Sequence, residues 1–275
     1  MEEIYLNVHS RYCFKDTLDI LRNAYSSTRI NMYDLDGTIH RGRNPKKYNG
    51  YSSVDFSIAL GKKLMLNLPH KVLEYASACL DTRKLKNDLE KIGLNKEDRD
   101  YAMVEVFFKG ALQGLPQDLV SSSTKKLPKL AYKKAKETIL ELSQYATTSA
   151  ILTKAFSSCA EPYVKWFQNN GLEMLLESHD FEVDENGIIE NLKQSLTLSK
   201  EEQVNRVLQL NEYNEALVFG DHDRDLEMTN ALDKKEFDYK LIAVNPFPGE
   251  SNQLTSKADL ILNGWEGIYN FLKLR

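Results

Sequence analysis

The chain has 275 residues, of which 42% are hydrophobic and 28% charged, and its formal net charge at pH 7 is −4. These proportions fit a globular protein with a sizeable core, and so small a net charge gives no electrostatic reason to expect nucleic acid as a partner. Three widely spaced cysteines argue against a disulfide framework or a zinc site, and the sequence lacks both a signal-peptide pattern and the ~20-residue apolar run of a transmembrane segment, which predicts a cytoplasmic protein.

The first informative stretch runs from Arg29 to Ile39 and is predicted to be a strand that ends in two carboxylates, Asp34 and Asp36. A short strand over residues 4–8 and a helix over residues 17–25 are expected before it. Side chains at the carboxyl ends of parallel strands face the crevice where ligands bind. Two acids two residues apart lie on one side of a strand end, and such like charges persist with a cation between them or a shared proton. This stretch therefore predicts a metal ion or an acid–base role.

A polar, basic loop that includes Arg41 and Arg43 follows, and we expect His40 beside it to lie at the surface. The loop is either a collector of anionic substrate or a solvated hinge. From about residue 53 to residue 117, apolar positions recur every three or four residues, which indicates helices. We therefore predict a helical cap over residues 41–127, inserted into a core formed by residues 1–40 and 128–275.

The rest of the chain alternates strands with helices. A strand is expected over residues 148–152 with Thr153 at its end, followed by a hairpin around the Asn-Gly pair at 186–187. Lys200 opens a helix for which Ser199 is the expected N-cap. Residues 216–219 form a buried strand that runs into Gly-Asp at 220–221, and strands near 241–244 and 259–262 and a helix over 265–274 complete the chain. This order predicts an α/β fold, a doubly wound parallel sheet with an inserted all-helical domain.

Several reactive side chains are expected to meet at the carboxyl ends of these strands. They are Asp34, Asp36, Thr153, Lys200, Asp221 and Asp225. Acids, one hydroxyl and one lysine in a single crevice can transfer a phosphoryl group through an aspartyl phosphate. Receiver domains also join paired acids, a threonine and a lysine on a parallel sheet, but the Gly-Thr after Asp36 and the large insertion argue against that class.

In these residues the chain resembles the haloacid dehalogenase (HAD) superfamily of phosphatases, and the helical insertion and the hairpin resemble its phosphoserine phosphatase-like branch. The resemblance implies a Rossmann-like core with a helical cap. It implies that Asp34 is the nucleophile and Asp36 the general acid and then the base. It also implies that Thr153 and Lys200 bind the phosphoryl group, and we include Thr38 among the expected substrate-binding residues, together with the two arginines of the basic loop.

The same resemblance implies Mg²⁺ as cofactor, held by Asp34, Asp221, Asp225 and Asp36, the last through its backbone carbonyl. The predicted activity is hydrolysis of a phosphomonoester. A phosphotransferase with the same intermediate and a non-catalytic binding protein with the same fold are the alternatives. The partner is a phosphorylated substrate, with a small molecule favoured and a phosphoprotein or a lipid headgroup left open.

Overall fold

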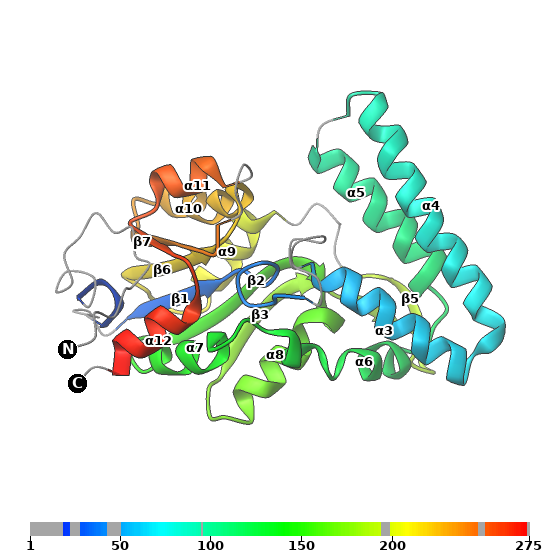
Figure 1. Ribbon diagram of the computed structural model, residues 1–275, viewed down its shortest axis with the longest axis horizontal. Helices are drawn as coiled ribbons and strands as arrows, with labels where there is room; N and C mark the ends of the chain where they lie inside the picture. Colours follow the sequence, from blue (N-terminus) through cyan, green and yellow to red (C-terminus); the bar gives the residue numbers. More distant parts are fainter. Residues whose placement is uncertain are drawn as a thin grey trace.

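A computed structural model describes residues 19–22, 28–42, 51–94, 96–193, 199–246 and 251–273 (Figure 1). Arg43, the strand expected over residues 4–8 and most of the helix expected over residues 17–25 lie outside the described residues. Within the described part of the chain, no helix has both the length and the apolar character needed to cross a membrane.

The centre of the molecule is a six-stranded sheet in the order β3-β2-β1-β6-β7-β8, with every neighbouring pair parallel. The strands are β1 (Arg29–Tyr33), β2 (Thr148–Phe156), β3 (Met174–His179), β6 (Glu215–Gly220), β7 (Asp238–Val244) and β8 (Leu260–Leu262). Strands covered on both faces read as continuous apolar runs, as in the buried Ala216–Phe219 of β6. The predicted doubly wound parallel sheet is confirmed.

Helices cover both faces of the sheet (Figure 1). On one face lie α7 (Ala135–Ser143), α8 (Ser157–Gln168) and α12 (Trp265–Lys273), and on the other α9 (Lys200–Leu208), α10 (Leu226–Asp233) and α11 (Asn252–Lys257). Successive strand residues point to opposite faces, so Phe219 joins the first core and Val218 the second. The loops at the strand ends are thereby fixed from both sides.

The predicted helical insertion is present between β1 and β2, and Figure 1 shows α4 and α5 projecting away from the sheet. Its helices are α3 (Ser52–Asn67), η1 (Pro69–Lys71), α4 (Val72–Lys91), α5 (Lys96–Phe107), η2 (Phe108–Leu112), α6 (Gln117–Thr124) and η3 (Leu127–Leu130). We call residues 52–124 the helical block. Its buried side chains, such as Phe56 and Leu64, belong to the same cluster as those beneath α7 and α8. The domain boundaries at 41 and 127 stay a prediction.

A two-stranded hairpin attaches the helical block to the core. The Asn-Gly prediction is confirmed, because β4 (Phe181–Val183) and β5 (Ile189–Leu192) pair in antiparallel fashion around Gly187, whose φ is +75°. The hairpin bonds to the extended segment after η2: Gly114 N donates to Ile189 O (2.8 Å), and Ile189 N donates to Leu115 O (3.0 Å). The block is therefore tied to the core by backbone bonds as well as by packing.

Strand β2 is longer than the sequence indicates. We expected it to end at Thr153, but it continues to Phe156, which pairs with His179 of β3 after an irregularity that begins at Leu152. The extension places the Phe156 ring against the ring of Phe56 in α3, at 6.4 Å between centroids. An apolar partner from the helical block thus explains why the strand runs on.

Candidate active site

The site begins where β1 and β6 end side by side. Tyr33 pairs with Phe219, and the amide of Asp34 donates to the carbonyl of Phe219 at 3.0 Å. Asp34 leaves β1 and Asp221 leaves β6 at the same edge of the sheet, and both are buried. Two strands that are far apart in the sequence therefore deliver two carboxylates to one point.

Lys200 lies between Asp34 and a third acid, Asp225. Its Nζ is 2.5 Å from Asp34 Oδ1 and 2.5 Å from Asp225 Oδ1, and only 4% of the residue is exposed. The predicted N-cap is confirmed: Ser199 and Glu202 form a capping box that fixes the first turn of α9, from which the lysine projects. The side chain that sequence alone distinguishes poorly from Lys193 is thus the one that enters the cluster.

Two glycines allow the acidic loops to approach each other. Gly37 has φ of +86°, and a Cβ built there would lie 2.0 Å from Asp221 Oδ2. A Cβ on Gly220 would lie 2.4 Å from the Cβ of Asp225. Glycine is the residue that permits both the left-handed backbone at position 37 and these distances.

The acids are held in orientation by further hydrogen bonds. Thr38 Oγ1 donates to Asp221 Oδ1 at 3.0 Å. Asp225 Oδ2 accepts from the amides of Asp221 and His222 at 2.8 and 3.0 Å. Thr38, expected to bind substrate, thus contacts a carboxylate, and its proposed role in substrate binding stays a prediction.

Asp34, Asp221 and Asp225 have the donor set of a cation site. One oxygen from each lies within 4.8 Å of the others, and all three residues are buried. If all are ionised, three carboxylates and one ammonium leave two negative charges uncompensated, the charge that a divalent cation would balance. Hard oxygen ligands of this kind suit Mg²⁺. The side chain of Asp36 lies outside this group, and its proposed contribution through a backbone carbonyl is untested.

The protonation of the cluster reflects its burial. Burial raises the pKa of Asp34 to about 7, with the charge of Lys200 opposing the rise. Burial and then the charges of Asp225 and Asp34 raise the pKa of Asp221 well above its usual range. Burial alone would lower the pKa of Lys200, but the two acids that it contacts raise it above its usual value. A cation would therefore stabilise the ionised carboxylates.

Asp36 points away from the cluster, toward the helical block. It is half-buried, and its Oδ1 accepts from the amide of Ser52, the first residue of α3, at 2.8 Å. Burial raises the pKa of Asp36, while the charge of His40 and the hydrogen bonds of Ser52 oppose the rise. An acid with a raised pKa suits proton transfer, although the catalytic role stays a prediction.

Thr153 lies one strand away from Asp34. Ile151 pairs with Tyr33, so Thr153, two residues later, is level with the residue after Asp34. Thr153 is buried, and its Oγ1 accepts from the amide of Ala155 at 3.1 Å. Its carbonyl accepts from Gln203 of α9 at 2.8 Å, which ties β2 to the helix that carries Lys200.

Of the two arginines predicted to bind substrate, Arg41 is among the described residues. Arg41 is exposed, and its backbone amide donates to Leu130 O at 2.9 Å. Tyr132, which belongs to no sequence motif, lies near Arg41 and Asp221. Burial and then the charge of Asp221 raise the pKa of Tyr132, and the charge of Arg41 opposes the rise. Sequence reasoning missed Tyr132 because its link to Asp221 arises only in the folded chain.

The expectation for His40 is wrong. The residue is fully buried, with Nδ1 2.5 Å from the hydroxyl oxygen of Tyr163 and Nε2 3.2 Å from Asp55 Oδ2. Both partners come from elements distant in the chain, α8 and α3. The polar, basic sequence beside His40 suggests exposure to solvent. In the folded chain Tyr163 and Asp55 make the hydrogen bonds that water would otherwise make to the ring.

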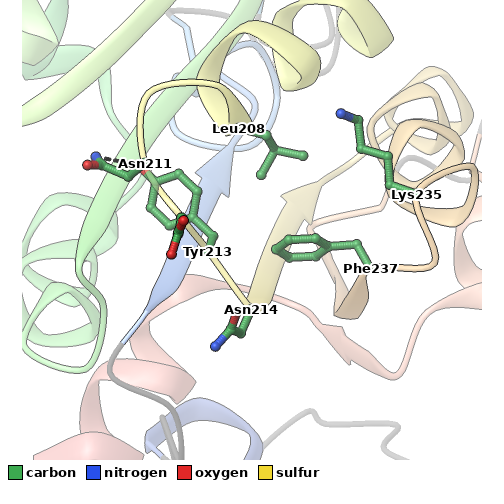
Figure 2. A pocket seen from close by; sticks show the side chains of 7 residues that line it. Leu208, Asn211, Tyr213, Asn214, Lys235 and Phe237 are labelled. Carbon is green, nitrogen blue, oxygen red and sulfur yellow. Dashed lines mark hydrogen bonds between the residues drawn. The ribbon is translucent and has the colours of Figure 1, made fainter.

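A separate pocket of about 390 Å³ lies at the amino ends of the strands, where β6 begins (Figure 2). In Figure 2 the rings of Tyr213 and Phe237 and the side chain of Leu208 face one another, with Lys235 near the rim. Tyr213 Oη donates to Thr148 Oγ1 at 3.0 Å. The pocket is therefore distinct from the acidic cluster, which follows the other end of β6.

No protein-family model matches the sequence, and no curated protein matches it. Solved structures do. A substrate-bound phosphoserine phosphatase is 17% identical, with 90% of this chain and 100% of that one covered at a TM-score of 0.55. The cytosolic 5′-nucleotidase IIIB bound to cytidine is 12% identical, with 89% and 85% covered and a TM-score of 0.61.

A HAD family hydrolase from Salmonella enterica is 13% identical, with 90% and 72% covered and a TM-score of 0.57. At these identities the likeness is one of fold. The chain shares the fold of these phosphatases and hydrolases, which is the fold that the resemblance to the HAD superfamily predicts.

Proposed function

We propose that this protein is a Mg²⁺-dependent phosphatase that hydrolyses a phosphomonoester with Asp34 as nucleophile. The observation that carries the proposal is the buried convergence of Asp34, Asp221 and Asp225 around Lys200 at the carboxyl ends of β1 and β6. The fold shared with a phosphoserine phosphatase and a 5′-nucleotidase supports a small phosphorylated substrate.

Asp34, Asp221 and Asp225 would hold the magnesium ion, together with the backbone carbonyl of Asp36. When bound, the ion would neutralise negative charge on the phosphoryl oxygens and so permit attack by an anionic nucleophile. The Lys200 ammonium, already 2.5 Å from Asp34, adds a second positive charge at the reacting group.

The chain's own residues account for the proton and bond changes. A carboxylate oxygen of Asp34 attacks phosphorus, the bond to the leaving oxygen breaks, and Asp36 gives that oxygen its proton. Asp36, now ionised, then takes a proton from water as the water oxygen attacks the phosphoaspartate, which releases inorganic phosphate and restores Asp34. The Thr153 hydroxyl would donate to a phosphoryl oxygen throughout. An alcohol in place of the water would make the same site a phosphotransferase.

The test is phosphate release from p-nitrophenyl phosphate by the wild type and by Asp34→Asn, each with Mg²⁺ and with EDTA. We expect turnover only in the wild type with Mg²⁺. Circular dichroism of the variant checks that the fold is retained. Equal turnover by the folded variant, or silence of the wild type across a broad panel of phosphate esters, would contradict the proposal, and the second result would favour a binding protein. An added alcohol that becomes phosphorylated would identify a phosphotransferase.

A further inference from the structure

The carboxylate of Asp36 also serves as the N-terminal cap of α3. The amides in the first turn of a helix have no partner within the helix. Here the side chain of the N-cap residue Tyr51 does not cap the helix, and Asp36 Oδ1 instead accepts from the amide of Ser52 at 2.8 Å. The proposed acid–base residue is thus oriented by the backbone of the helical block.

The same turn of α3 is fixed to the core by a buried polar network. Asp55, three residues after Ser52, is 3% exposed and contacts Nε2 of the fully buried His40 at 3.2 Å. Nδ1 of His40 is 2.5 Å from the hydroxyl of Tyr163, which itself donates to Leu127 O at 2.9 Å. Two elements, α3 and α8, therefore meet at this imidazole, and Tyr163 links it to a third, η3.

The hydrogen bonds of Tyr163 indicate which atoms of the network donate and which accept. Because the hydroxyl proton of Tyr163 is used for the Leu127 carbonyl, His40 Nδ1 must donate to the tyrosine oxygen. The other ring nitrogen, Nε2, shares a hydrogen with Asp55 Oδ2 at 3.2 Å. A buried pair of this kind is strongly perturbed when one partner is removed, because the other is left uncompensated.

His40 and Asp36 belong to one tight loop. The two residues form a β-bridge, and the amide of Gly37 donates to His40 O at 3.1 Å. The first turn of α3 thus contacts this loop at two points: Ser52 bonds to Asp36, and Asp55 bonds to His40. A shift of the helix would move the amide away from the carboxylate.

We propose that the buried His40–Asp55 pair positions Asp36 for catalysis, by fixing the first turn of α3 so that the Ser52 amide holds the carboxylate in place. His40 and Asp55 are therefore positioning residues that act on the reaction through Asp36. The inference rests on the proposed function and goes beyond it, since it assigns proton delivery to a contact between the helical block and the core. Misplacement of a catalytic group by about 1 Å can lower a rate about 100-fold.

Leaving-group dependence provides a readout that a merely structural role would not change. p-Nitrophenolate leaves with little help from an acid, whereas an alkoxide must be protonated as it leaves. We would measure release of the leaving group in the first turnover, with p-nitrophenyl phosphate and with an alkyl phosphate that the wild type accepts. Asp36→Asn is the reference variant: its rate of leaving-group release should fall far more with the alkyl phosphate than with p-nitrophenyl phosphate.

Asp55→Asn and His40→Gln are expected to lose about 10- to 100-fold on the alkyl phosphate and less than about threefold on p-nitrophenyl phosphate. Tyr75→Phe is the matched control. It removes a hydroxyl that donates to α3 one turn later, at Ser57 O (2.8 Å), without touching the network, and it should leave both reactions unchanged.

Ser52→Pro tests the amide itself. Proline is favoured at the first position of a helix, and Tyr51, with φ −65° and ψ 116°, has the backbone that a following proline requires. The substitution deletes the N–H that Asp36 accepts, and Ser52→Ala, which keeps the amide, provides the reference for loss of the hydroxyl. We expect Ser52→Pro to show the same selective loss of the alkyl reaction as Asp55→Asn.

Equal losses on both substrates, or no loss on either, in folded Asp55→Asn and Ser52→Pro would overturn the inference while the wild type still turns over. If Asp55→Asn does not fold, His40→Gln and Ser52→Pro decide the question, again by the loss on the alkyl phosphate relative to the loss on p-nitrophenyl phosphate. Absence of leaving-group release by the wild type on every ester would instead overturn the proposed function, and the inference with it. The two failures are therefore distinguishable.

Discussion

At the carboxyl ends of β1 and β6, buried charged side chains lie within hydrogen-bond distance of one another, whereas along α3 and α4 long apolar side chains face solvent. Asp34, Lys200 and Asp225 are each less than 7% exposed, but Leu66 and Leu73 are 83% and 82% exposed. Charge is stable in the interior only when it is paired and hydrogen-bonded, so the strand-end site is specified by individual contacts. Beyond the polar contacts at the first turn of α3 and at the hairpin, the helical block is held by the apolar packing of one face. Substitutions in the two regions should therefore have different readouts.

The largest effect is expected from Lys200→Met. The substitution keeps the length of the side chain but removes the ammonium between Asp34 and Asp225, so the proposed nucleophile loses the charge that balances it. We expect turnover to fall by about 10²- to 10³-fold. Lys193→Met is the matched control, because this lysine pairs with Asp180 at 2.8 Å outside the cluster. Equal losses in the two variants would contradict the assignment of Lys200.

In the helical block, the corresponding test is one of stability. Phe56 of α3 is fully buried and lies 6.4 Å from both Phe107 and Phe156, ring centroid to ring centroid. Phe56→Ala should lower the free energy of unfolding by about 3–5 kcal/mol, measured by urea denaturation. Leu73→Ala, at an exposed position, should change it by less than about 0.5 kcal/mol. If the two variants were equally stable, the block would not be held by this packing.

Gly37→Ala sharpens the comparison within the loops. The new Cβ would lie 2.0 Å from Asp221 Oδ2 on a backbone with φ of +86°, whereas in Gly171→Ala a similar φ of +83° meets no atom within 4 Å. Both variants carry about 1 kcal/mol of left-handed strain, and overlap in the first adds about 1–3 kcal/mol. Gly37→Ala should also weaken Mg²⁺ binding, measured by calorimetry. Equal costs would show that Asp221 can move aside.

The sequence predicts the strand-end site because its chemistry is local. Asp34, Asp36 and Gly37 follow an apolar strand directly, and the geometry of a parallel sheet brings Asp221 beside them without knowledge of any side-chain contact. For Lys200 the sequence predicts the start of its helix through Ser199, whereas its choice over Lys193 depends on the contacts with Asp34 and Asp225. The alternation of strands and helices likewise sufficed for the doubly wound fold.

What the sequence could not predict depends on distant partners. His40 is buried because Asp55 and Tyr163, 15 and 123 residues away, meet its two nitrogens. The amide of Ser52 is likewise a backbone donor that no residue type marks. β2 continues past Thr153 because Phe156 packs against Phe56 and pairs with His179. No residue near Phe156 in the sequence indicates either contact.

The smallest predicted effect concerns acid, and it differs in sign between two buried sites. Burial and then the charge of Lys154 lower the pKa of His179, at the end of β3, to about 4. Its Nδ1 has no hydrogen-bond partner among the described residues. The folded protein keeps this imidazole neutral, while the unfolded chain takes up a proton below about pH 6.5. Its contribution to stability is therefore present above pH 6.5 and is lost as the pH falls toward 4.

The raised pKa values of Asp34 and Asp221 act in the opposite direction, because in the absence of a metal those folded carboxylates hold protons that the unfolded chain releases. Comparison of the wild type with His179→Gln isolates the histidine, since both chains share the acids. Between pH 7 and pH 5 the wild type should lose up to about 2 kcal/mol more stability than the variant, at about 1.4 kcal/mol per pH unit below 6.5. Urea midpoints at the two pH values measure the difference. Parallel losses would mean that His179 takes up its proton at the same pH in the folded protein as in the unfolded chain, so that it makes no contribution to the pH dependence of stability.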